Sequence, residues 1–332
     1  MPNKTRHHYV KHAAQTNSQS DSLVKVTVTN DSGTWIKPNS GDKFYIDANA
    51  TFPSILFEIQ TEVAPPYEWQ WRIEWNAHVS GLKERIRTGR KLKTFLERSG
   101  TFLSNSKLWE ADLNQKILGG KLTVTAKAGE VEFRRTVVIL GKNPVEEDVT
   151  VFLATIPNTT GFDKLIGQES KFKNFINADG EPIVAGDAGY GMTQLTTPSP
   201  SYQQIWSWKE NVRAGANLFQ QKQVSARNYL SQGGRHYTDE QLAMETISRW
   251  NGGGYHTWNP ESLSWERNPT MLCDPKTGNI GWDTGDPANS DKSVDQLHDR
   301  DVKQYSKMKA GQGSDHPWKY SGVCYADHLA ND

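Results

Sequence analysis

The chain has 332 residues, which is enough for two domains of ordinary size. Its 38 Lys and Arg residues balance 38 Asp and Glu residues, so the overall charge gives no reason to expect a nucleic acid or a membrane as partner. The balance is uneven along the chain, because residues 1–142 contain 21 basic and 14 acidic side chains and the rest contain the remaining 17 and 24. This split favours two separate units over one continuous domain.

Residues 1–22 are polar and have no apolar stretch after their basic residues. They predict a disordered leader and no secretory signal peptide. No apolar run in the chain approaches the roughly 20 residues that a membrane-spanning helix needs. We therefore expect a protein that is made in the cytoplasm and that needs a dedicated delivery route to act elsewhere.

Residues 23–142 have the period-two pattern of β-strands. The clearest example is the segment 68–75, where Trp and Ile alternate with polar side chains. The stretches 121–125 and 131–140 flank a turn-like segment, which indicates a hairpin. Several short strands at this spacing predict an antiparallel β-sandwich of immunoglobulin-like type.

A proline and a run of acidic residues at 144–148 break the strand pattern, and we place a domain boundary there. Beyond it the apolar spacing becomes helical. Thr160 is a candidate N-cap, and a capping box opens a predicted helix over 238–250. The segment 255–292 is rich in Gly, Pro, Asn and Asp and predicts a loop. Residues 150–332 are therefore expected to form a second domain that is mainly α-helical.

The two cysteines, Cys273 and Cys324, lie near the C-terminus. A disulfide between them would close a loop of about 50 residues and add roughly 3–4 kcal/mol of stability in an oxidising compartment. Two buried free thiols are an equally good prediction for a chain without a secretory signal. No zinc-site spacing occurs, and the Asp-rich segment 283–295 lacks the ligand spacing of a calcium-binding EF-hand. We expect neither a metal nor another cofactor.

A basic segment lies at 83–98, with seven basic and two acidic residues. Such a run suits an anionic partner or polymer. A solvated surface is the more common meaning of a charge run, and that is our prediction here.

Cleavage of a glycosidic bond near neutral pH needs a proton for the departing oxygen. The usual donor is a carboxylic acid whose pKa has been raised by an apolar pocket. Glu169 follows Leu165 and Ile166 by about one helical turn, so its side chain would leave the inward-facing side of a helix. Taken alone, this spacing favours a surface glutamate paired with Lys173 at i+4. The surrounding sequence reverses that preference.

Three short motifs follow one another in the order found in one enzyme superfamily. They are a Gln-Glu-Ser triplet, a glycine-rich turn and an Asn-Gly stretch at the end of a later predicted helix, at 168–170 (QES), 186–195 (GDAGYGMTQL) and 248–254 (SRWNGGG). Together they resemble the core of goose-type lysozymes and soluble lytic transglycosylases. The resemblance implies a lysozyme-like helical fold and cleavage of peptidoglycan glycan strands.

By this resemblance Glu169 is the general acid, and Gly191 and Gln194 shape the cleft with backbone close to the sugars. The residues expected to contact substrate are Tyr190, Gln194, Trp250, Asn251, Trp206 and Trp208. The last two, with Tyr202, are expected to stack on sugar rings. Core packing is nearly as good an interpretation of these three aromatic residues, and Asn251 and the glycines after it would also serve to end a helix.

Two positions depart from the family pattern. Transglycosylases commonly have Tyr where this chain has Trp250, so a hydroxyl that orients the acid is missing there. Goose-type enzymes have two Asp residues that position a water molecule; Asp187 resembles the first, and Thr196 stands where the second would fall. Inverting hydrolysis needs a second carboxylate roughly 6.5–9.5 Å from the acid, and Asp187 is the candidate, with Asp179 a weaker one. Without such a base, attack by the muramic acid's own hydroxyl gives an anhydro product.

We therefore expect a muramidase, a glycosidase that cleaves between N-acetylmuramic acid and N-acetylglucosamine, with Glu169 and Asp187 as catalytic residues. A lytic transglycosylase is the alternative within the superfamily, and a non-catalytic glycan-binding or structural protein is the alternative from another class. Such an enzyme joined to a sandwich module fits an antibacterial effector, a toxin delivered into a rival's periplasm, and fits a phage lysis or tail protein almost as well. The partners implied are peptidoglycan, an immunity protein that blocks the cleft, and a secretion or phage tail apparatus.

Overall fold

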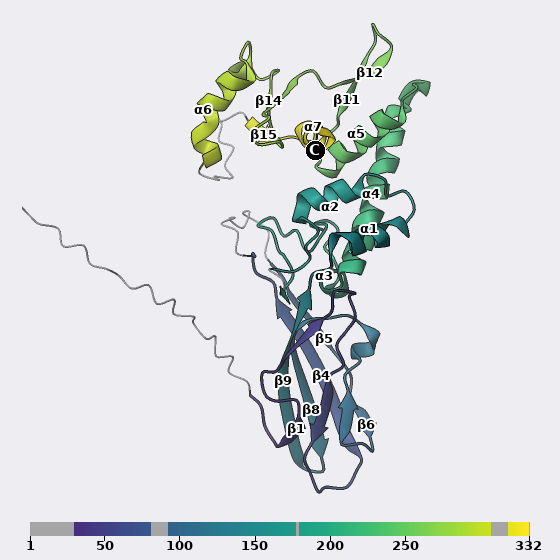
Figure 1. Cartoon of the computed structure of the whole chain (residues 1–332), viewed down its shortest axis with the longest axis vertical. Helices are drawn as coiled ribbons and strands as arrows, with labels where there is room; N and C mark the ends of the chain where they lie inside the picture. The colour runs from purple at the N-terminus through teal and green to yellow at the C-terminus, as the bar shows by residue number, and fades with distance from the viewer. Residues whose placement is uncertain (1–29, 81–91, 177–178, 307–317, 332) are drawn as a thin grey trace, which may run out of the picture.

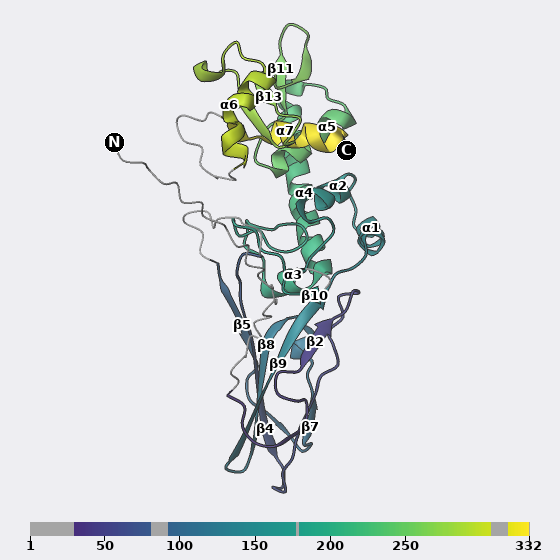
Figure 2. The same ribbon diagram turned by 60° about the vertical axis from the view of Figure 1, so that its left-hand side comes forward.

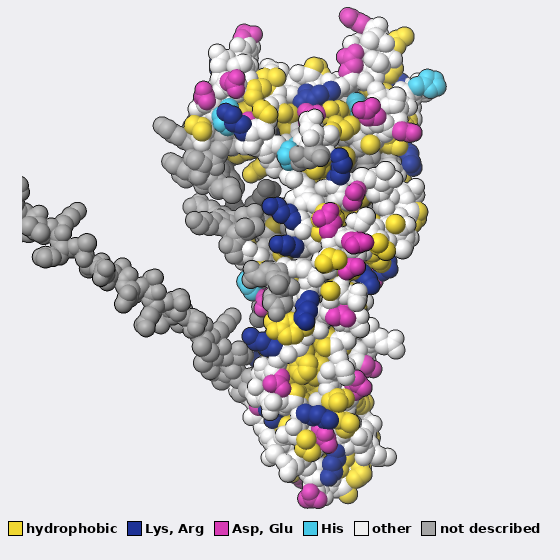
Figure 3. Space-filling view, viewed as in Figure 1, with side chains coloured by type: hydrophobic (Ala, Val, Ile, Leu, Met, Phe, Trp, Pro, Cys, Tyr) yellow, Lys and Arg dark blue, Asp and Glu magenta, His cyan; other side chains and the backbone are white. Residues whose placement is uncertain are grey.

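A computed structural model describes residues 30–80, 92–176, 179–306 and 318–331 of the protein. The molecule is elongated, with the strands of its N-terminal half at one end, a group of helices next, and a small mixed region at the opposite end (Figure 1). Charged side chains of both signs are mixed along the face seen in Figure 3, in keeping with the balanced composition. Within the described ranges, no helix has the length and apolar character that a membrane span requires.

Two sheets make up the N-terminal half. The larger has seven strands, which are β2 (Lys43–Ile46), β4 (Tyr67–Asn76), β5 (Thr94–Arg98), β6 (Phe102–Ser104), β8 (Gly120–Ala128), β9 (Val131–Lys142) and β10 (Asp179–Gly180). The smaller has three, which are β1 (Trp35–Lys37), β3 (Leu56–Ile59) and β7 (Leu108–Glu110). β4, β8 and β9 form the antiparallel centre of the larger sheet, and β5 and β6 both pair with β4. β9 also pairs in parallel with β2 and, at its end, antiparallel with β10.

Alternating side chains account for the central strand. β4 buries one face, made of Tyr67, Trp69, Trp71, Ile73 and Trp75, and exposes more of the polar residues between them. The strand predicted at 68–75 is therefore confirmed. The predicted hairpin is confirmed as well, because β8 and β9 pair as far as Ala128 and Val131, and Gly129 adopts the positive φ of 57° that a tight hairpin turn requires.

The prediction of an immunoglobulin-like sandwich followed by a mainly α-helical domain is wrong. An immunoglobulin-like sandwich consists of antiparallel strands from one contiguous stretch of chain. The larger sheet here contains a parallel strand, β2, and a strand from beyond residue 142, β10, and the helical half carries two small sheets of its own. The alternating pattern identified strands but not their partners, because pairing depends on residues that are far apart in the sequence.

Helices dominate the middle of the chain. The described residues contain the α-helices α1 (Glu146–Ala154), α2 (Phe162–Ser170), α3 (Tyr202–Trp206), α4 (Trp208–Leu230), α5 (Asp239–Trp250), α6 (Val294–Ser306) and α7 (Gly322–Asn331), and the short 3-10 helices η1 (Leu113–Gln115), η2 (Gln232–Gly234) and η3 (Pro287–Asn289). The capping box predicted at the start of α5 is confirmed, with Thr238 and Gln241 as its two members. The N-cap predicted for α2 is wrong, because Gly161 occupies that position and Thr160 lies outside it.

Short strands replace the loop predicted at 255–292. They form a two-stranded sheet of β11 (His256–Asn259) and β12 (Ser264–Arg267), and a three-stranded sheet of β13 (Met271–Cys273), β14 (Ile280–Asp283) and β15 (Trp318–Tyr320). The turn-forming residues that suggested a loop connect these strands. Strands of three or four residues are too short to show a clear alternating pattern.

One hydrophobic core continues across the segment between the sheet and the helices. The ring of Trp206 in α3 meets that of Trp75 in β4 edge to face, with centroids 5.5 Å apart. The hydroxyl of Tyr202 donates to the carbonyl of Gly119, 2.6 Å away. A side chain at Gly119 would collide with Trp206, because a Cβ built there lies 2.0 Å from its ring. Figure 2 shows α3 and β10 at this junction.

Candidate active site

Glu169 is the penultimate residue of α2, and its side chain is half-buried. The helix packs by Phe162, Leu165 and Ile166, all of them buried. It ends at once after Ser170, since Lys171 and the residue that follows it have positive φ angles. These apolar residues hold one side of α2 against the core. Glu169 lies in the last turn on that side, so its side chain points towards the interior.

Two donors meet the same oxygen of Glu169. The Tyr325 hydroxyl donates to Oε1 over 2.7 Å, and the Trp250 indole Nε1–H donates to it over 3.2 Å. Trp250 ends α5, and its ring lies edge to face against Phe162 of α2, with centroids 5.5 Å apart. Tyr325 belongs to α7 and is buried. Three helices that are distant in the sequence therefore assemble around one carboxyl group.

Burial raises the pKa of Glu169 above its usual value of 4.5, and the charge of Asp187 raises it further. The hydrogen bonds from Tyr325 and Trp250 act in the opposite direction, because they favour the ionised form, but the net pKa remains raised. The position of Glu169 at the C-terminal end of a helix also disfavours an anion, since the partial charge there is negative. The site therefore holds a proton on Glu169 more tightly than water does on a free glutamate.

The hydrogen bonds to Glu169 also indicate which of its two oxygens carries the proton. Oε1 accepts both hydrogen bonds, whereas Oε2 of Glu169 has no hydrogen-bond partner among the described residues. A proton on Oε1 would compete with two donors that already point at it. Burial raises the pKa of Tyr325, and the charge of Glu169 raises it further, so its hydroxyl remains a donor. Oε2 is thus the oxygen able to give a proton to a ligand.

Asp187 lies near the tip of a tight turn that Val184 and Tyr190 close by a β-bridge. Its Oδ1 accepts the backbone N–H of Gly189 over 3.2 Å, and its side chain is half-buried. It is close enough for its charge to affect the pKa of Glu169. The structure thus brings together the two residues predicted to be catalytic. The side chain of Asp179, the weaker candidate, lies outside the described part.

Two buried asparagines hold the Gly-Met-Thr-Gln motif. The Asn174 side chain accepts the Met192 backbone N–H over 3.0 Å, and that of Asn211 accepts the Thr193 N–H over 2.8 Å. Both asparagines are fully buried. Gly191 has a φ of 72°, and a Cβ built on it lies 2.4 Å from Nδ2 of Asn211 and 2.7 Å from Oδ1 of Asn174. Glycine was expected at this position because the backbone would lie close to the sugars. The structure gives a different reason: a glycine leaves room for the two asparagine amides.

The other residues expected to contact substrate are distributed differently. Gln194 is half-buried and donates through Nε2 to the Gly191 carbonyl over 2.7 Å, so its amide holds the turn. Asn251 is exposed and is the C-cap residue of α5, directly after Trp250. Four aromatic rings are buried in the protein interior, with no exposed face for a ligand. They are Tyr190, which was expected to contact substrate, and the three expected to stack on sugars, Tyr202, Trp206 and Trp208. Core packing, the structural alternative for Tyr202 and the two tryptophans, is what the structure shows.

Tyr325 was not predicted from the sequence; its hydroxyl reaches Glu169 from α7, whereas the resemblance places a tyrosine at the position of Trp250. Its position depends on close contact between α7 and the end of α5. A Cβ built on Gly322, the first residue of α7, lies 2.4 Å from the Ser248 carbonyl oxygen, and its own Cα approaches Gly253 closely. The glycines after Asn251 thus allow two backbones to meet. In the sequence, the only sign of the contact between α5 and α7 is that Gly253 and Gly322 are small. Their contact itself cannot be seen in the sequence, because they are far apart in the chain.

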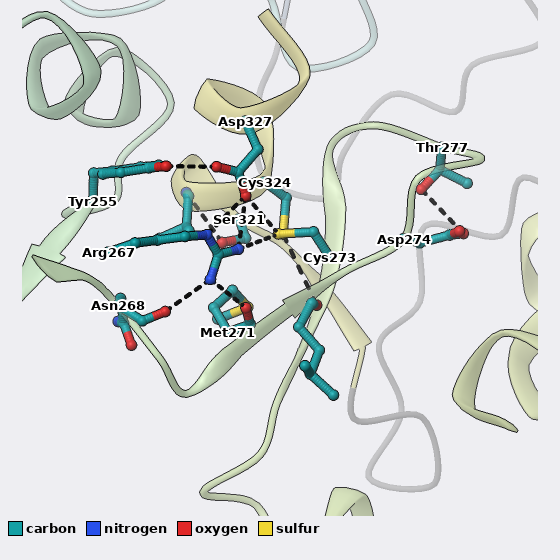
Figure 4. The surroundings of a disulfide bond; sticks show 12 residues. Tyr255, Arg267, Asn268, Met271, Cys273, Asp274, Thr277, Ser321, Cys324 and Asp327 are labelled. Atoms are coloured by element: carbon teal, nitrogen blue, oxygen red, sulfur yellow. Dashed lines mark hydrogen bonds and ion pairs between the residues drawn. A yellow bond between two sulfur atoms is a disulfide. The ribbon is translucent and has the colours of Figure 1, made fainter. Parts of the chain in front are cut away.

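A disulfide and an ion pair also hold α7 in place, through residues on either side of Tyr325 in the sequence (Figure 4). Cys273 and Cys324 are bonded, which decides between the two predictions made for them. The Arg267 guanidinium lies 2.7 Å from an Asp327 oxygen, and the Tyr255 hydroxyl donates to the other oxygen over 2.6 Å. These contacts tie α7 to β12 and β13 on both sides of Tyr325. They fix the donor that meets Glu169.

A buried carboxylate orders the segment after Asn251. Oε2 of Glu245 accepts the backbone N–H groups of Tyr255 and His256, each over 3.0 Å, and Arg249 lies 2.8 Å from its Oε1. Burial raises the pKa of Glu245, but the hydrogen bonds from His256 outweigh it and leave the pKa below its usual value. Glu245 is therefore a structural anion, and its pKa is shifted in the opposite direction from that of Glu169.

No metal centre is apparent among the described residues, because no three His, Cys, Asp or Glu side chains are grouped to hold an ion. In the Asp-rich segment, Asp283 pairs with Lys319 over 3.2 Å. No protein-family model matches the chain, and no curated protein matches it. The chemistry of the site has to be inferred from its own geometry.

Gly191→Ala should destabilise the protein by about 2 kcal/mol or more, because the added Cβ collides with two buried amides and the left-handed backbone becomes strained. The measurement is urea unfolding. Gly41→Ala is the matched control, since Gly41 has a φ of 74° and nothing within 4 Å of a built Cβ. Equal losses in the two variants would contradict the packing explanation.

Tyr325→Phe should raise the pKa of Glu169 further, because it removes a hydrogen bond that favours the ionised form. A ¹³C NMR titration of the glutamate carboxyl carbons measures this directly. Tyr320→Phe removes a hydroxyl from a half-exposed ring in β15 and should leave the titration unchanged. A Glu169 pKa that falls or stays constant in Tyr325→Phe would show that the hydroxyl is not its donor.

Glu169→Gln should change stability in a pH-dependent way. The folded pKa of Glu169 lies above the unfolded one, so between these two values the folded state binds more protons and the free energy of unfolding falls as pH rises. Glutamine is neutral and accepts the same two hydrogen bonds. We expect the Tm of the variant to exceed that of the wild type at about pH 7, and this gap to shrink towards about pH 4. Glu130→Gln, at an exposed turn, should show no such gap; a pH-independent gap for Glu169→Gln would contradict the raised pKa.

Proposed function

We propose that the protein is a glycosidase that cleaves peptidoglycan glycan strands between N-acetylmuramic acid and N-acetylglucosamine, with Glu169 as general acid. One observation carries this proposal: a half-buried carboxyl group with a raised pKa has one oxygen held by Tyr325 and Trp250 and the other without a partner among the described residues. A surface glutamate paired with Lys173 has none of these features. The choice of peptidoglycan as substrate comes from the resemblance of the three motifs to lysozymes and transglycosylases.

In this mechanism Oε2 of Glu169 gives its proton to the glycosidic oxygen as the bond to the sugar breaks. The negative charge then develops on a carboxylate whose Oε1 already accepts hydrogen bonds from Tyr325 and Trp250. These two donors are thus better partners for the ionised acid than for the neutral one, and they stabilise charge as it forms. Burial raises the pKa of Glu169 and so favours the protonated form that the step requires.

Asp187 is the proposed base. Its charge is close enough to raise the pKa of Glu169, and inverting hydrolysis needs a second carboxylate that activates water on the opposite side of the sugar. The backbone N–H of Gly189 holds one of its oxygens. Hydrolysis with a water molecule would give reducing muramic acid ends.

The setting of the activity is part of the proposal. We infer an antibacterial effector that acts on peptidoglycan in the periplasm of a target cell, because the Cys273–Cys324 bond suits an oxidising compartment. A phage lysis protein would work in the same compartment. An immunity protein in the producing cell would then block access to Glu169.

The proposal predicts that purified full-length protein releases soluble fragments from peptidoglycan sacculi. Chromatography and mass spectrometry of the fragments should show reducing muramic acid ends. Glu169→Gln should lower the rate by about 100-fold or more, because it removes the proton donor and leaves the surrounding hydrogen bonds in place. Glu130→Gln is the control for a change of charge alone. Asp187→Asn should also slow hydrolysis.

Each contrary result has a definite meaning. Fragments with anhydro-muramic ends would assign a lytic transglycosylase, and Asp187 would lose its role as base. Full activity in Glu169→Gln would remove Glu169 as the acid. A wild type that binds sacculi and releases nothing would favour the non-catalytic glycan-binding protein.

A further inference from the structure

A polar groove lies on the outer face of the larger sheet, on different elements from those that form the Glu169 site. Its volume is about 290 Å³. The lining residues come mainly from β4, β5, β8 and β9, and they are Asn30, Gln70, Trp71, Arg72, Arg98, Ser99, Lys121, Thr123, Thr125, Arg134 and Thr136. This volume is close to the lower bound of roughly 300 Å³ for small-molecule sites. The groove therefore has room for one or two small units of a ligand.

The strand register places two arginines against each other in this groove. Arg72 of β4 lies directly opposite Arg98 of β5, and on its other side it lies opposite Thr123 of β8. Like charges on directly opposite residues of neighbouring strands destabilise a sheet. An anion between the two guanidinium groups would remove that repulsion, and a guanidinium can hold a carboxylate through two parallel hydrogen bonds.

The charge of the groove is one-sided. Four of the lining side chains are cationic and none is a carboxylate. Arg72 pairs with Glu74 over 3.0 Å, and Arg134 pairs with Glu132 over 3.3 Å. Arg98 and Lys121 have no ion pair with any described residue. Two cations are thus left to attract an acidic ligand.

The remaining lining groups are hydrogen-bonding groups and not stacking surfaces. Thr123, Thr125 and Gln70 supply hydroxyl and amide groups to the groove, whereas Thr136 is buried and hydrogen-bonded to Thr123. The one aromatic residue, Trp71, points its ring into the core and is only 3% exposed. Proteins that bind single-stranded nucleic acid rely on exposed aromatic rings for stacking with bases. Hydroxyls beside cations are better suited to a sugar that carries an acidic group.

We propose that this groove is a second ligand site and binds an acidic sugar unit of an anionic polysaccharide. The acidic group lies between Arg72 and Arg98, with Lys121 nearby, and the threonine and glutamine side chains bind the sugar hydroxyls. The site attaches the protein to a polysaccharide independently of any cleavage. It does not depend on the role proposed for Glu169.

The test measures binding of fluorescently labelled tetragalacturonate to the full-length protein by anisotropy. The Glu169→Gln background prevents any cleavage from complicating the signal. We expect saturable binding that weakens between about 50 mM and about 200 mM NaCl, because charge attraction is screened by salt. Labelled maltotetraose, which is neutral, should not bind.

Replacement of Arg98 and Lys121 by Gln should weaken binding of tetragalacturonate by about tenfold or more, because hydrogen bonds to charged groups are lost. The matched control replaces Lys222 and Arg227 of α4 by Gln, with the same change in charge, and should bind like the parent protein. Unchanged circular dichroism and Tm would show that each variant is folded. Equal weakening in the two double variants, absence of saturable binding, or tighter binding of a single-stranded oligonucleotide would overturn the proposal.

Discussion

The site depends on one oxygen atom, Oε1 of Glu169, which accepts hydrogen bonds from Tyr325 and Trp250. Two donors on one carboxylate oxygen would ordinarily make the group more acidic, but burial outweighs them and the pKa stays raised. The result is a carboxyl group that binds its proton more tightly than a free glutamate and whose ionised form already has two hydrogen-bond donors. Such an arrangement needs a dry pocket and accurately placed donors together, so it depends on the packing of α2, α5 and α7.

The accuracy of that placement comes from close backbone contacts and cross-links, in addition to the hydrophobic core that buries Tyr325. Gly253 and Gly322 let the end of α5 and the start of α7 meet backbone to backbone. The Cys273–Cys324 bond lies beside Tyr325 in the sequence, and the Arg267–Asp327 pair follows it by less than a helical turn. α7 is thus held before and after the residue that donates to Glu169. Loss of one contact would leave the others in place.

The features predicted correctly were local ones. The alternation in β4, the hairpin of β8 and β9 and the capping box of α5 follow from neighbouring residues, and so does the helix that carries Glu169. Long-range contacts were not predictable: the parallel pairing of β2, the short strands after residue 255, and Tyr325 at the site. Buried aromatic rings such as Trp206 look the same in a sequence whether they face a ligand or a core. Only tertiary packing distinguishes the two.

The shared core between sheet and helices has a further consequence. Trp206 fills the space above Gly119, and β10 extends the sheet from beyond residue 142, so each half supplies part of the other's interior. The helical half is therefore not a portable module that could be exchanged among proteins or expressed alone. A chain divided near residue 145 would expose aromatic surface on both fragments, and the fragments would tend to aggregate. Truncation and engineering of this protein therefore have to keep the larger sheet together with the segment that carries β10 and Trp206.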